Sequence, residues 1–273
     1  MNKPLILGAV AYDPKVVTIW EGFKAWFETR GLAFDYRLFS TYEAQVESHL
    51  RDELDAAWNS PLAHVQSMAA AKKKSRAVHA VAMRDTDQDL TSVVLMKKGG
   101  TLESLKGKRV GVGAADSPQA TLIPLSHLAD LGLEPGRQLE VVRHDVLLGK
   151  HGDHIGGERE AVKALLAGKV DAACIIDGNA LAFAQDGTLP RGELEVVTQT
   201  KKYDHCVFTT FDLPGTARFV ELLLAMSWDD PKVRPLLELE GLKQWRLGRT
   251  SGFAQLERAV QRFGTLDEWL SRQ

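Results

Sequence analysis

Apolar residues along the chain alternate between two kinds of pattern. Short apolar runs of four to six residues are typical of buried strands, and longer stretches with apolar residues every three or four positions are typical of helices. In the first third, the pattern predicts strands at Leu5–Val10, Phe34–Phe39, Ala56–Trp58 and His79–Met83, and helices at Val16–Arg30, Tyr42–Arg51 and Pro61–Lys74. Strands and helices therefore alternate from the N-terminus onward, which is typical of α/β proteins with parallel sheets.

The same alternation recurs in the second half of the chain. The predicted elements are strands Ser92–Lys97, Arg109–Gly113, Leu139–His144, Ala172–Ile176, Val196–Gln199 and Val207–Thr210, with helices Gln119–Leu131 and Glu158–Ala167. The remainder, from Pro214, has a helical pattern. We expect this C-terminal part to pack on the first half.

Local motifs repeat between the two halves. Leu54-Asp55-Ala56-Ala57 opens a strand in the first half, and Val170-Asp171-Ala172-Ala173 does so in the second. Gly8 to Pro14 has a counterpart in Gly111 to Pro118. The repeat predicts two α/β lobes, with lobe one formed by residues 1–95 and 205–273 and lobe two by residues 96–204. Ligands of open α/β sheets bind beyond the carboxyl ends of the strands, so we expect a ligand cleft between the lobes.

The composition of the chain argues against nucleic-acid binding, attachment to a membrane and a disulfide-stabilised fold. The chain has 273 residues, 44 % hydrophobic residues and a formal net charge of −2, so we expect neither a nucleic-acid partner nor attachment to a membrane surface. No apolar run is long enough to span a bilayer, so the protein is not expected to be membrane-embedded. No signal peptide is recognisable, which predicts a cytoplasmic protein, or a periplasmic one if the chain is a processed form. Two cysteines argue against a disulfide framework.

Four stretches together resemble the substrate-binding proteins of phosphate, phosphite and phosphonate ABC transporters. They are Thr41-Tyr-Glu-Ala-Gln-Val46, Asp55-Ala-Ala-Trp-Asn-Ser-Pro61, Leu102-Glu-Ser-Leu-Lys-Gly-Lys108, and Ala161-Val-Lys-Ala-Leu-Leu-Ala-Gly-Lys-Val-Asp-Ala-Ala173. The resemblance implies the two-lobed type II periplasmic-binding-protein fold and a phosphonate-like or phosphate-like ligand. It also implies an ABC permease as a partner.

Polar residues at the ends of the predicted strands form the candidate binding site. Several precede helices, where backbone N–H groups and the positive helix end favour anions without any Lys or Arg. The alternative for each residue is ordinary helix capping, which selects the same residue types. The candidate ligand-binding residues are Tyr12, Thr41, Tyr42, Asn59, Ser60, Ser117, Gln119, His151, His154 and Asp177.

The loop from His151 to His154 is the most unusual of these segments. It is rich in Gly and carries two His residues, Asp153 and Glu158 at the start of a helix. Three interpretations are open: contact with the ligand, a surface or capping loop, and a metal site. We predict ligand contact and no metal. If a His is protonated to meet an anion, affinity should fall as the pH rises through about 6 to 7.5.

Two further segments carry reactive side chains. His205 and Cys206 lie next to each other before a predicted strand, and adjacent residues of a strand point to opposite faces. We therefore expect Cys206 to be a buried structural residue rather than half of a nucleophile pair. Asp85-Thr86-Asp87 is expected to be a solvated loop, with contact to a ligand amino group as the alternative.

The sequence favours a binding protein that closes its two lobes on a small anionic or zwitterionic ligand. No nucleophile–base pair or metal motif is evident, so we expect no catalytic residues and no cofactor. The alternative is a cytoplasmic enzyme on the same fold that acts on a small metabolite, and enzymatic activity stays open because a fold does not fix a function. A ligand sensor with a protein partner is a third hypothesis.

Overall fold

The computed structural model describes residues 3–152, 155–190 and 192–273, which form two compact α/β lobes. Lobe one comprises residues 1–88, 204–253 and 269–273, and lobe two comprises residues 89–203 and 254–268. The chain thus leaves lobe one after Gln88 and returns to it at Asp204. These limits differ from the predicted ones because the strand Ser92–Lys97 belongs wholly to the lobe-two sheet.

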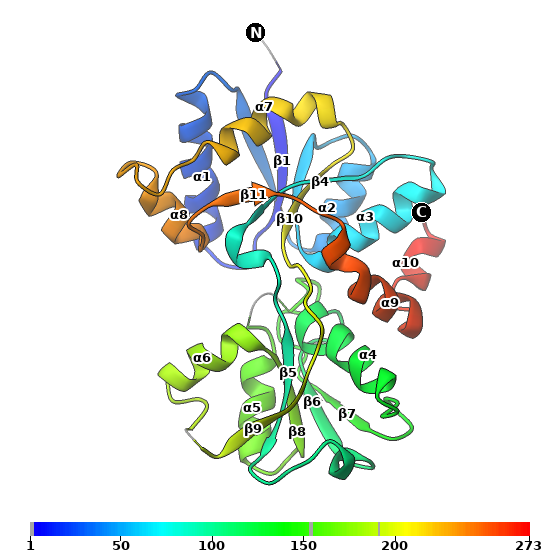
Figure 1. The fold of residues 1–273 in the computed structure, drawn as a ribbon. Helices are drawn as coiled ribbons and strands as arrows, with labels where there is room; N and C mark the ends of the chain where they lie inside the picture. The colour runs from blue at the N-terminus through cyan, green and yellow to red at the C-terminus, as the bar shows by residue number, and fades with distance from the viewer. Residues whose placement is uncertain (1–2, 153–154, 191) are drawn as a thin grey trace. The chain divides into compact units, whose positions relative to one another are not determined.

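Lobe one is built on a six-stranded mixed sheet with the strand order β11-β4-β10-β3-β1-β2. Its strands are β1 (Leu5–Val10), β2 (Phe34–Phe39), β3 (Ala56–Asn59), β4 (His79–Arg84), β10 (Val207–Thr210) and β11 (Trp245–Leu247). Its helices are α1 (Lys15–Glu28), α2 (Tyr42–Leu50), α3 (Pro61–Lys73), α7 (Leu213–Leu224) and α8 (Arg234–Glu240), with short 3₁₀ turns η1 (Asp85–Asp87) and η4 (Ser251–Phe253) (Figure 1). The terminal α10 (Asp267–Ser271) begins in the last residues of lobe two and ends in lobe one.

Lobe two is built on a five-stranded mixed sheet with the strand order β7-β6-β8-β5-β9. Its strands are β5 (Ser92–Lys97), β6 (Arg109–Val112), β7 (Glu140–Arg143), β8 (Ala172–Ile176) and β9 (Leu194–Gln199). Its helices are the 3₁₀ turn η2 (Glu103–Leu105), the π-helical turn η3 (Pro118–Leu122), α4 (Ile123–Asp130), α5 (Glu158–Leu166), α6 (Asp177–Gln185) and α9 (Ala254–Phe263).

The internal repeat has a structural counterpart in the two sheets. In lobe one β1 pairs in parallel with β2 and β3, and in lobe two β6 pairs in parallel with β7 and β8. The Asp of the repeated motif makes the same kind of backbone hydrogen bond in both lobes. The Asp55 carboxylate accepts the N–H of Ile6 at 2.7 Å, and the Asp171 carboxylate accepts the N–H of Arg109 at 2.9 Å. Each Asp therefore fixes the start of the first strand of its unit.

Hydrophobic residues cover both faces of each sheet. In lobe one, α1, α7 and α8 enclose an aromatic cluster on one face, which includes Trp20, Phe23, Phe27, Phe219 and Trp245. On the other face α2 and α3 cover a smaller cluster. In lobe two, α4 packs on one face, and α5 with α6 on the other. Burial of each large aromatic ring stabilises the lobe by several kcal/mol, because replacing it by Ala typically costs about 3–5 kcal/mol.

The C-terminal part departs from the prediction in two ways. Trp245–Leu247 forms β11, which pairs antiparallel with β4, although a three-residue strand is too short for a recognisable alternation. The helix α9 belongs to lobe two rather than lobe one: it packs against α4, and Arg262 donates to the Ser126 carbonyl at 2.5 Å. The predicted helix Gln119–Leu131 also differs, because it begins with the π-helical turn η3.

Candidate functional site

In lobe one, hydroxyl residues begin the helices that follow β2 and β3. Thr41 caps α2, where its hydroxyl oxygen accepts the N–H of Ala44 at 3.3 Å. Ser60 caps α3, where its hydroxyl oxygen accepts the N–H of Ala63 at 3.1 Å. Both helix starts lie at the carboxyl ends of parallel strands, where the positive helix end favours an anion. Capping uses an oxygen lone pair, and a hydroxyl also has a hydrogen to donate.

Two of the other lobe-one candidates, Asn59 and Tyr42, are buried, as Ser60 is. Asn59 is fully buried, and its side chain accepts from Gln45 Nε2 at 2.7 Å and donates to Ser67 Oγ at 3.5 Å. Tyr42 is 3 % exposed within the hydrophobic cluster beneath α2 and α3. Tyr12, by contrast, is half-buried at the end of β1. Asn59 and Tyr42 thus contribute to packing and hydrogen bonding inside lobe one. Their contact with a ligand stays a prediction.

In lobe two, Ser117 and Gln119 occupy the turn that follows β6. Ser117 begins η3, and its hydroxyl oxygen accepts the N–H of Ala120 at 3.2 Å. Gln119 is fully buried and donates from Nε2 to the Gly152 carbonyl at 3.1 Å. This bond connects the first turn of η3 to the loop between β7 and α5. The two predicted segments, Ser117–Gln119 and the His151 loop, are therefore neighbours in lobe two.

His151 is buried in that loop, with a positive φ of 54° and 3 % exposure. Burial lowers the pKa of His151 to about 3, so its imidazole is neutral near pH 7. Burial therefore disfavours a protonated His151 as the partner of an anion, because the imidazolium would lose its hydration inside the lobe. His154 lies outside the described residues, and contact of either His with a ligand stays a prediction.

The carboxyl group of Glu158, which the sequence places with this loop but not among the candidate ligand-binding residues, follows directly after it. Glu158, the first residue of α5, is fully buried. Its Oε2 accepts from the Ile176 N–H at 3.0 Å and from Asn179 Nδ2 at 2.9 Å. Burial raises the pKa of Glu158 to about 8, and bonds from Asn179, Ile176 and Gln119 only partly offset this rise. Glu158 is therefore largely protonated at neutral pH.

Asp177 begins α6 directly after β8. Its carboxylate accepts from the Thr91 hydroxyl at 2.6 Å, and Thr91 in turn accepts from Gln199 Nε2 at 2.6 Å. These residues come from the ends of β8, β5 and β9. The carboxylate is half-buried, so it offers negative charge at the edge of lobe two where β8 ends.

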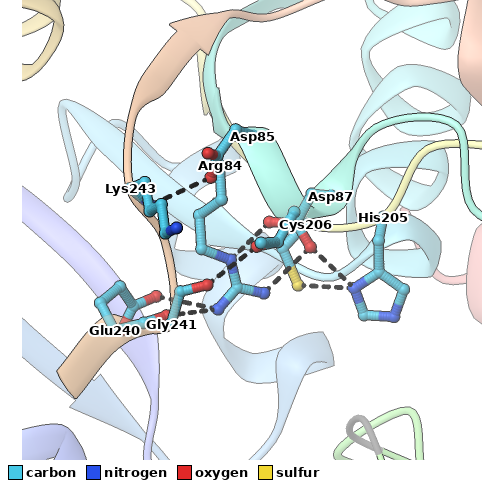
Figure 2. Close-up of polar contacts among 9 residues, drawn as sticks. Arg84, Asp85, Asp87, His205, Cys206, Glu240, Gly241 and Lys243 are labelled. Carbon is cyan, nitrogen blue, oxygen red and sulfur yellow. Dashed lines mark hydrogen bonds and ion pairs between the residues drawn. The ribbon is translucent and has the colours of Figure 1, made fainter. Parts of the chain in front are cut away.

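Lobe one also contains a buried ionic cluster that the sequence did not reveal (Figure 2). Arg84 at the end of β4 donates from Nε and Nη2 to the two carboxylate oxygens of Asp87, at 2.5 and 3.0 Å. Its Nη1 donates to the carbonyl of Glu240 at 2.9 Å and lies 3.3 Å from the Glu240 carboxylate. Although burial opposes ionisation, the charge and hydrogen bonds of Arg84 hold the pKa of Asp87 below its usual range.

The same cluster includes the adjacent His205 and Cys206. His205 Nδ1 lies 3.1 Å from Cys206 Sγ and 3.5 Å from Asp87 Oδ1. The expectation that His205 and Cys206 point apart is wrong, because both residues precede β10 and the strand alternation does not apply to them. The expectation that Asp85–Asp87 is solvated is wrong for Asp87, which is 1 % exposed. The predicted burial of Cys206 is confirmed, at 2 % exposure.

The two α/β lobes, each with hydroxyl-capped helix starts at the carboxyl ends of parallel strands, are the fold of a two-lobed substrate-binding protein. A family model described as "ABC transporter, phosphonate, periplasmic substrate-binding protein" matches residues 9–251. The chain therefore belongs to this family. The resemblance stated from sequence motifs is confirmed.

Solved structures agree on the fold. PhnD1 from Prochlorococcus marinus (MIT 9301), in complex with methylphosphonate, is 18 % identical with a TM-score of 0.69, and the match covers 96 % of this chain and 98 % of that one. A Xanthomonas citri protein bound to ATP is 14 % identical with a TM-score of 0.70, covering 96 % and 98 %. A binding protein component of a phosphonate transporter from Pseudomonas aeruginosa is 13 % identical with a TM-score of 0.61, covering 99 % and 97 %. No curated protein matches the sequence.

The predicted fold class, α/β with two type II periplasmic-binding-protein lobes, is confirmed by these neighbours. Across the described helices, none is both long enough and apolar enough to cross a membrane.

Proposed function

We propose that the protein is the ligand-binding component of an ABC importer and binds a small phosphonate-like anion or zwitterion. Membership of the phosphonate-binding family supports the transporter role, with an ABC permease as the partner. The structure of the Prochlorococcus relative contains methylphosphonate, which supports the ligand class. The family description also supports a periplasmic location over the cytoplasmic one.

The observation that carries the proposal is the set of hydroxyl caps at helix starts. Thr41, Ser60 and Ser117 each follow a parallel strand and begin a helix or helical turn. An anion at such a position can accept backbone N–H bonds and a hydroxyl bond, and the helix dipole favours its negative charge. This arrangement binds an oxyanion without a Lys or Arg in the set.

A second feature supports a zwitterionic ligand as well as a simple anion. Asp177 presents a half-buried carboxylate at the end of β8, in the same lobe as Ser117. A carboxylate repels a phosphonate but attracts an ammonium group. An aminoalkylphosphonate would therefore gain from Asp177, and methylphosphonate would not.

Calorimetric titration with methylphosphonate and 2-aminoethylphosphonate tests the proposal. Ser60→Ala and Ser117→Ala should each weaken methylphosphonate binding by about tenfold or more, because a bond to a charged group contributes about 1.5–3 kcal/mol. Asp177→Asn should weaken only the aminoalkylphosphonate.

The matched control is Thr101→Ala. Thr101 Oγ1 also accepts a backbone N–H, from Ser104 at 3.2 Å, but it precedes β6 and so lies at the amino end of that strand. This variant should bind as the wild type does. Equal affinities for Ser60→Ala, Ser117→Ala and Thr101→Ala, with all variants folded, would contradict the proposed site.

A further inference from the structure

Three potential metal ligands meet in the buried cluster of lobe one. Asp87 comes from η1, and His205 and Cys206 directly precede β10. In the described part of the chain they form the one group of three or more such side chains close enough to share an ion, with all donor atoms within 4.8 Å of one another. The main chain holds the two segments together, because the His205 N–H donates to the Asp87 carbonyl at 2.8 Å. Each of the three residues is at most 2 % exposed.

The spacing of the donor atoms fits a tetrahedral zinc site. Zinc bonds nitrogen and oxygen at about 2.0–2.2 Å and sulfur at about 2.3 Å, which places neighbouring donors about 3.3–3.8 Å apart. His205 Nδ1 lies 3.1 Å from Cys206 Sγ and 3.5 Å from Asp87 Oδ1. Small side-chain shifts would therefore bring the three atoms to coordination distance. Thiolate with imidazole favours zinc over the hard cations magnesium and calcium.

The charges of the cluster also suit a divalent cation. Arg84 carries one positive charge and is paired with the two carboxylates of Asp87 and Glu240, which leaves one net negative charge. Zn²⁺ together with a Cys206 thiolate adds one net positive charge, and the buried cluster becomes neutral. Neutrality matters here because an uncompensated charge inside a protein is costly.

Arg84 would serve as an outer partner of the site. It donates to both Asp87 oxygens, and each carboxylate oxygen has a second acceptor direction that can face a metal. Such outer hydrogen bonds orient a ligand and typically strengthen metal binding by 10- to 100-fold. Figure 2 shows Arg84 on one side of Asp87 and His205 on the other, with the Cys206 sulfur between the Arg84 guanidinium and the His205 ring.

We propose that Asp87, His205 and Cys206 bind one Zn²⁺ ion inside lobe one, at a site separate from the hydroxyl caps proposed for the ligand. The site joins the two segments through which the chain passes between lobes. Asp87 is one residue before the end of the first lobe-one segment at Gln88, and His205 is one residue after the return at Asp204. Zinc would fasten these segments to each other independently of the transported ligand.

Binding of Co²⁺ and Zn²⁺ to the full chain, stripped of metal by a chelator, tests the proposal. Co²⁺ should bind one per chain and give a thiolate-to-cobalt charge-transfer band, and Zn²⁺ should displace it. Cys206→Ser should abolish the band and weaken Zn²⁺ binding by more than about tenfold, because a thiolate ligand is lost.

The matched control is Cys174→Ser, which removes the other buried thiol. Cys174 lies in β8 of lobe two, and burial raises its pKa to about 12. This variant should keep the cobalt band. Absence of the band from the wild-type protein would overturn the proposal even if Cys206→Ser fails to fold, and so would a band that survives Cys206→Ser. Either result would assign the cluster to a metal-free hydrogen-bond network.

Discussion

At the scale of single residues, the buried polar groups distinguish the two lobes. Lobe one buries charges that are paired: Arg84 lies between Asp87 and Glu240. Lobe two buries Glu158, which has hydrogen-bond donors at Oε2 but no cationic partner among the residues that the structure describes, and its pKa rises to about 8. Within the described residues, the buried oxygens Glu158 Oε1 and Gln119 Oε1 accept no hydrogen bond, and a proton on Glu158 would give its carboxyl group a donor.

Glu158→Gln should make the stability of lobe two less dependent on pH. An ordinary Glu titrates near 4.5, whereas Glu158 in the fold titrates near 8. Between these values the folded state binds more protons than the unfolded state, so the free energy of unfolding falls as the pH rises. The amide cannot ionise and can still donate. At pH 8.5 the variant should be more stable than the wild type by about 2–4 kcal/mol, and near pH 4.5 the two should be similar.

Urea unfolding at these two pH values measures the effect. Glu160→Gln is the control, because Glu160 lies on the same helix but is exposed and paired with Lys163. It should change the stability by less than about 1 kcal/mol at either pH. A destabilised Glu158→Gln at pH 8.5 would show that the carboxylate, rather than the acid, is the form that the fold requires.

The hydroxyl caps could be predicted from the sequence, but the buried cluster and the burial of Glu158 could not. An acidic residue at the first turn of a helix is usually explained by the helix dipole, so the sequence of α5 gave no sign that Glu158 is buried. The burial involves Ile176 at the end of β8 and Asn179 of α6, which are distant in the chain and meet Glu158 only in the folded lobe. The position of Asp87 beside Arg84 and His205 likewise depends on β4 and β10 being neighbours in the sheet.

At the scale of elements, the predictions agree best with the structure where an apolar pattern continues over at least four residues. The strands Ser92–Lys97, Ala172–Ile176 and Val207–Thr210 begin and end at the predicted residues. The strand β11 was not predicted because its three residues are too few to show a recognisable alternation. The placement of α9 in lobe two was not predicted because a helical pattern indicates a helix but not the lobe against which it packs. The repeated Asp55 and Asp171 were informative because each fixes a strand start through a backbone bond.

Gly152→Ala should disturb the contact between the His151 loop and η3. Gly152 has a φ of 60°, and a Cβ there would come within 2.7 Å of the Ser117 Cβ. The side chain therefore adds a clash to the backbone strain, and we expect a loss of about 2–4 kcal/mol of stability together with weaker ligand binding. Thermal unfolding and calorimetric titration of the variant measure the two effects.

The control separates the clash from the strain. Gly187 in the same lobe has a φ of 81°, but a Cβ there meets nothing within 4 Å. Gly187→Ala should therefore cost only about 1 kcal/mol and leave binding unchanged. If the two variants behave alike, then the packing of Gly152 on Ser117 does not shape the site.

At the scale of the whole molecule, the internal sequence repeat indicates that the chain forms two α/β lobes. The sequence predicted two α/β lobes and a return to lobe one after the last lobe-two strand, and the chain does return there at Asp204. The family match and the solved neighbours fix the fold class. They do not fix the ligand, because identities of 13–18 % establish the fold alone. The central claim is therefore that this chain binds a phosphonate-like anion and leaves it chemically unchanged.

Phosphorus NMR of methylphosphonate during titration with the protein tests this claim most directly, because one spectrum reports both binding and conversion. We predict that the methylphosphonate resonance broadens or shifts in proportion to the protein added. In a separate sample it should recover when an excess of 2-aminoethylphosphonate, whose own phosphorus resonance is assigned beforehand, competes for the site. Without competitor, no phosphorus resonance of a new compound should grow over hours. An unperturbed methylphosphonate resonance at protein concentrations of about 1 mM would contradict binding, and a growing new resonance would identify the protein as an enzyme instead.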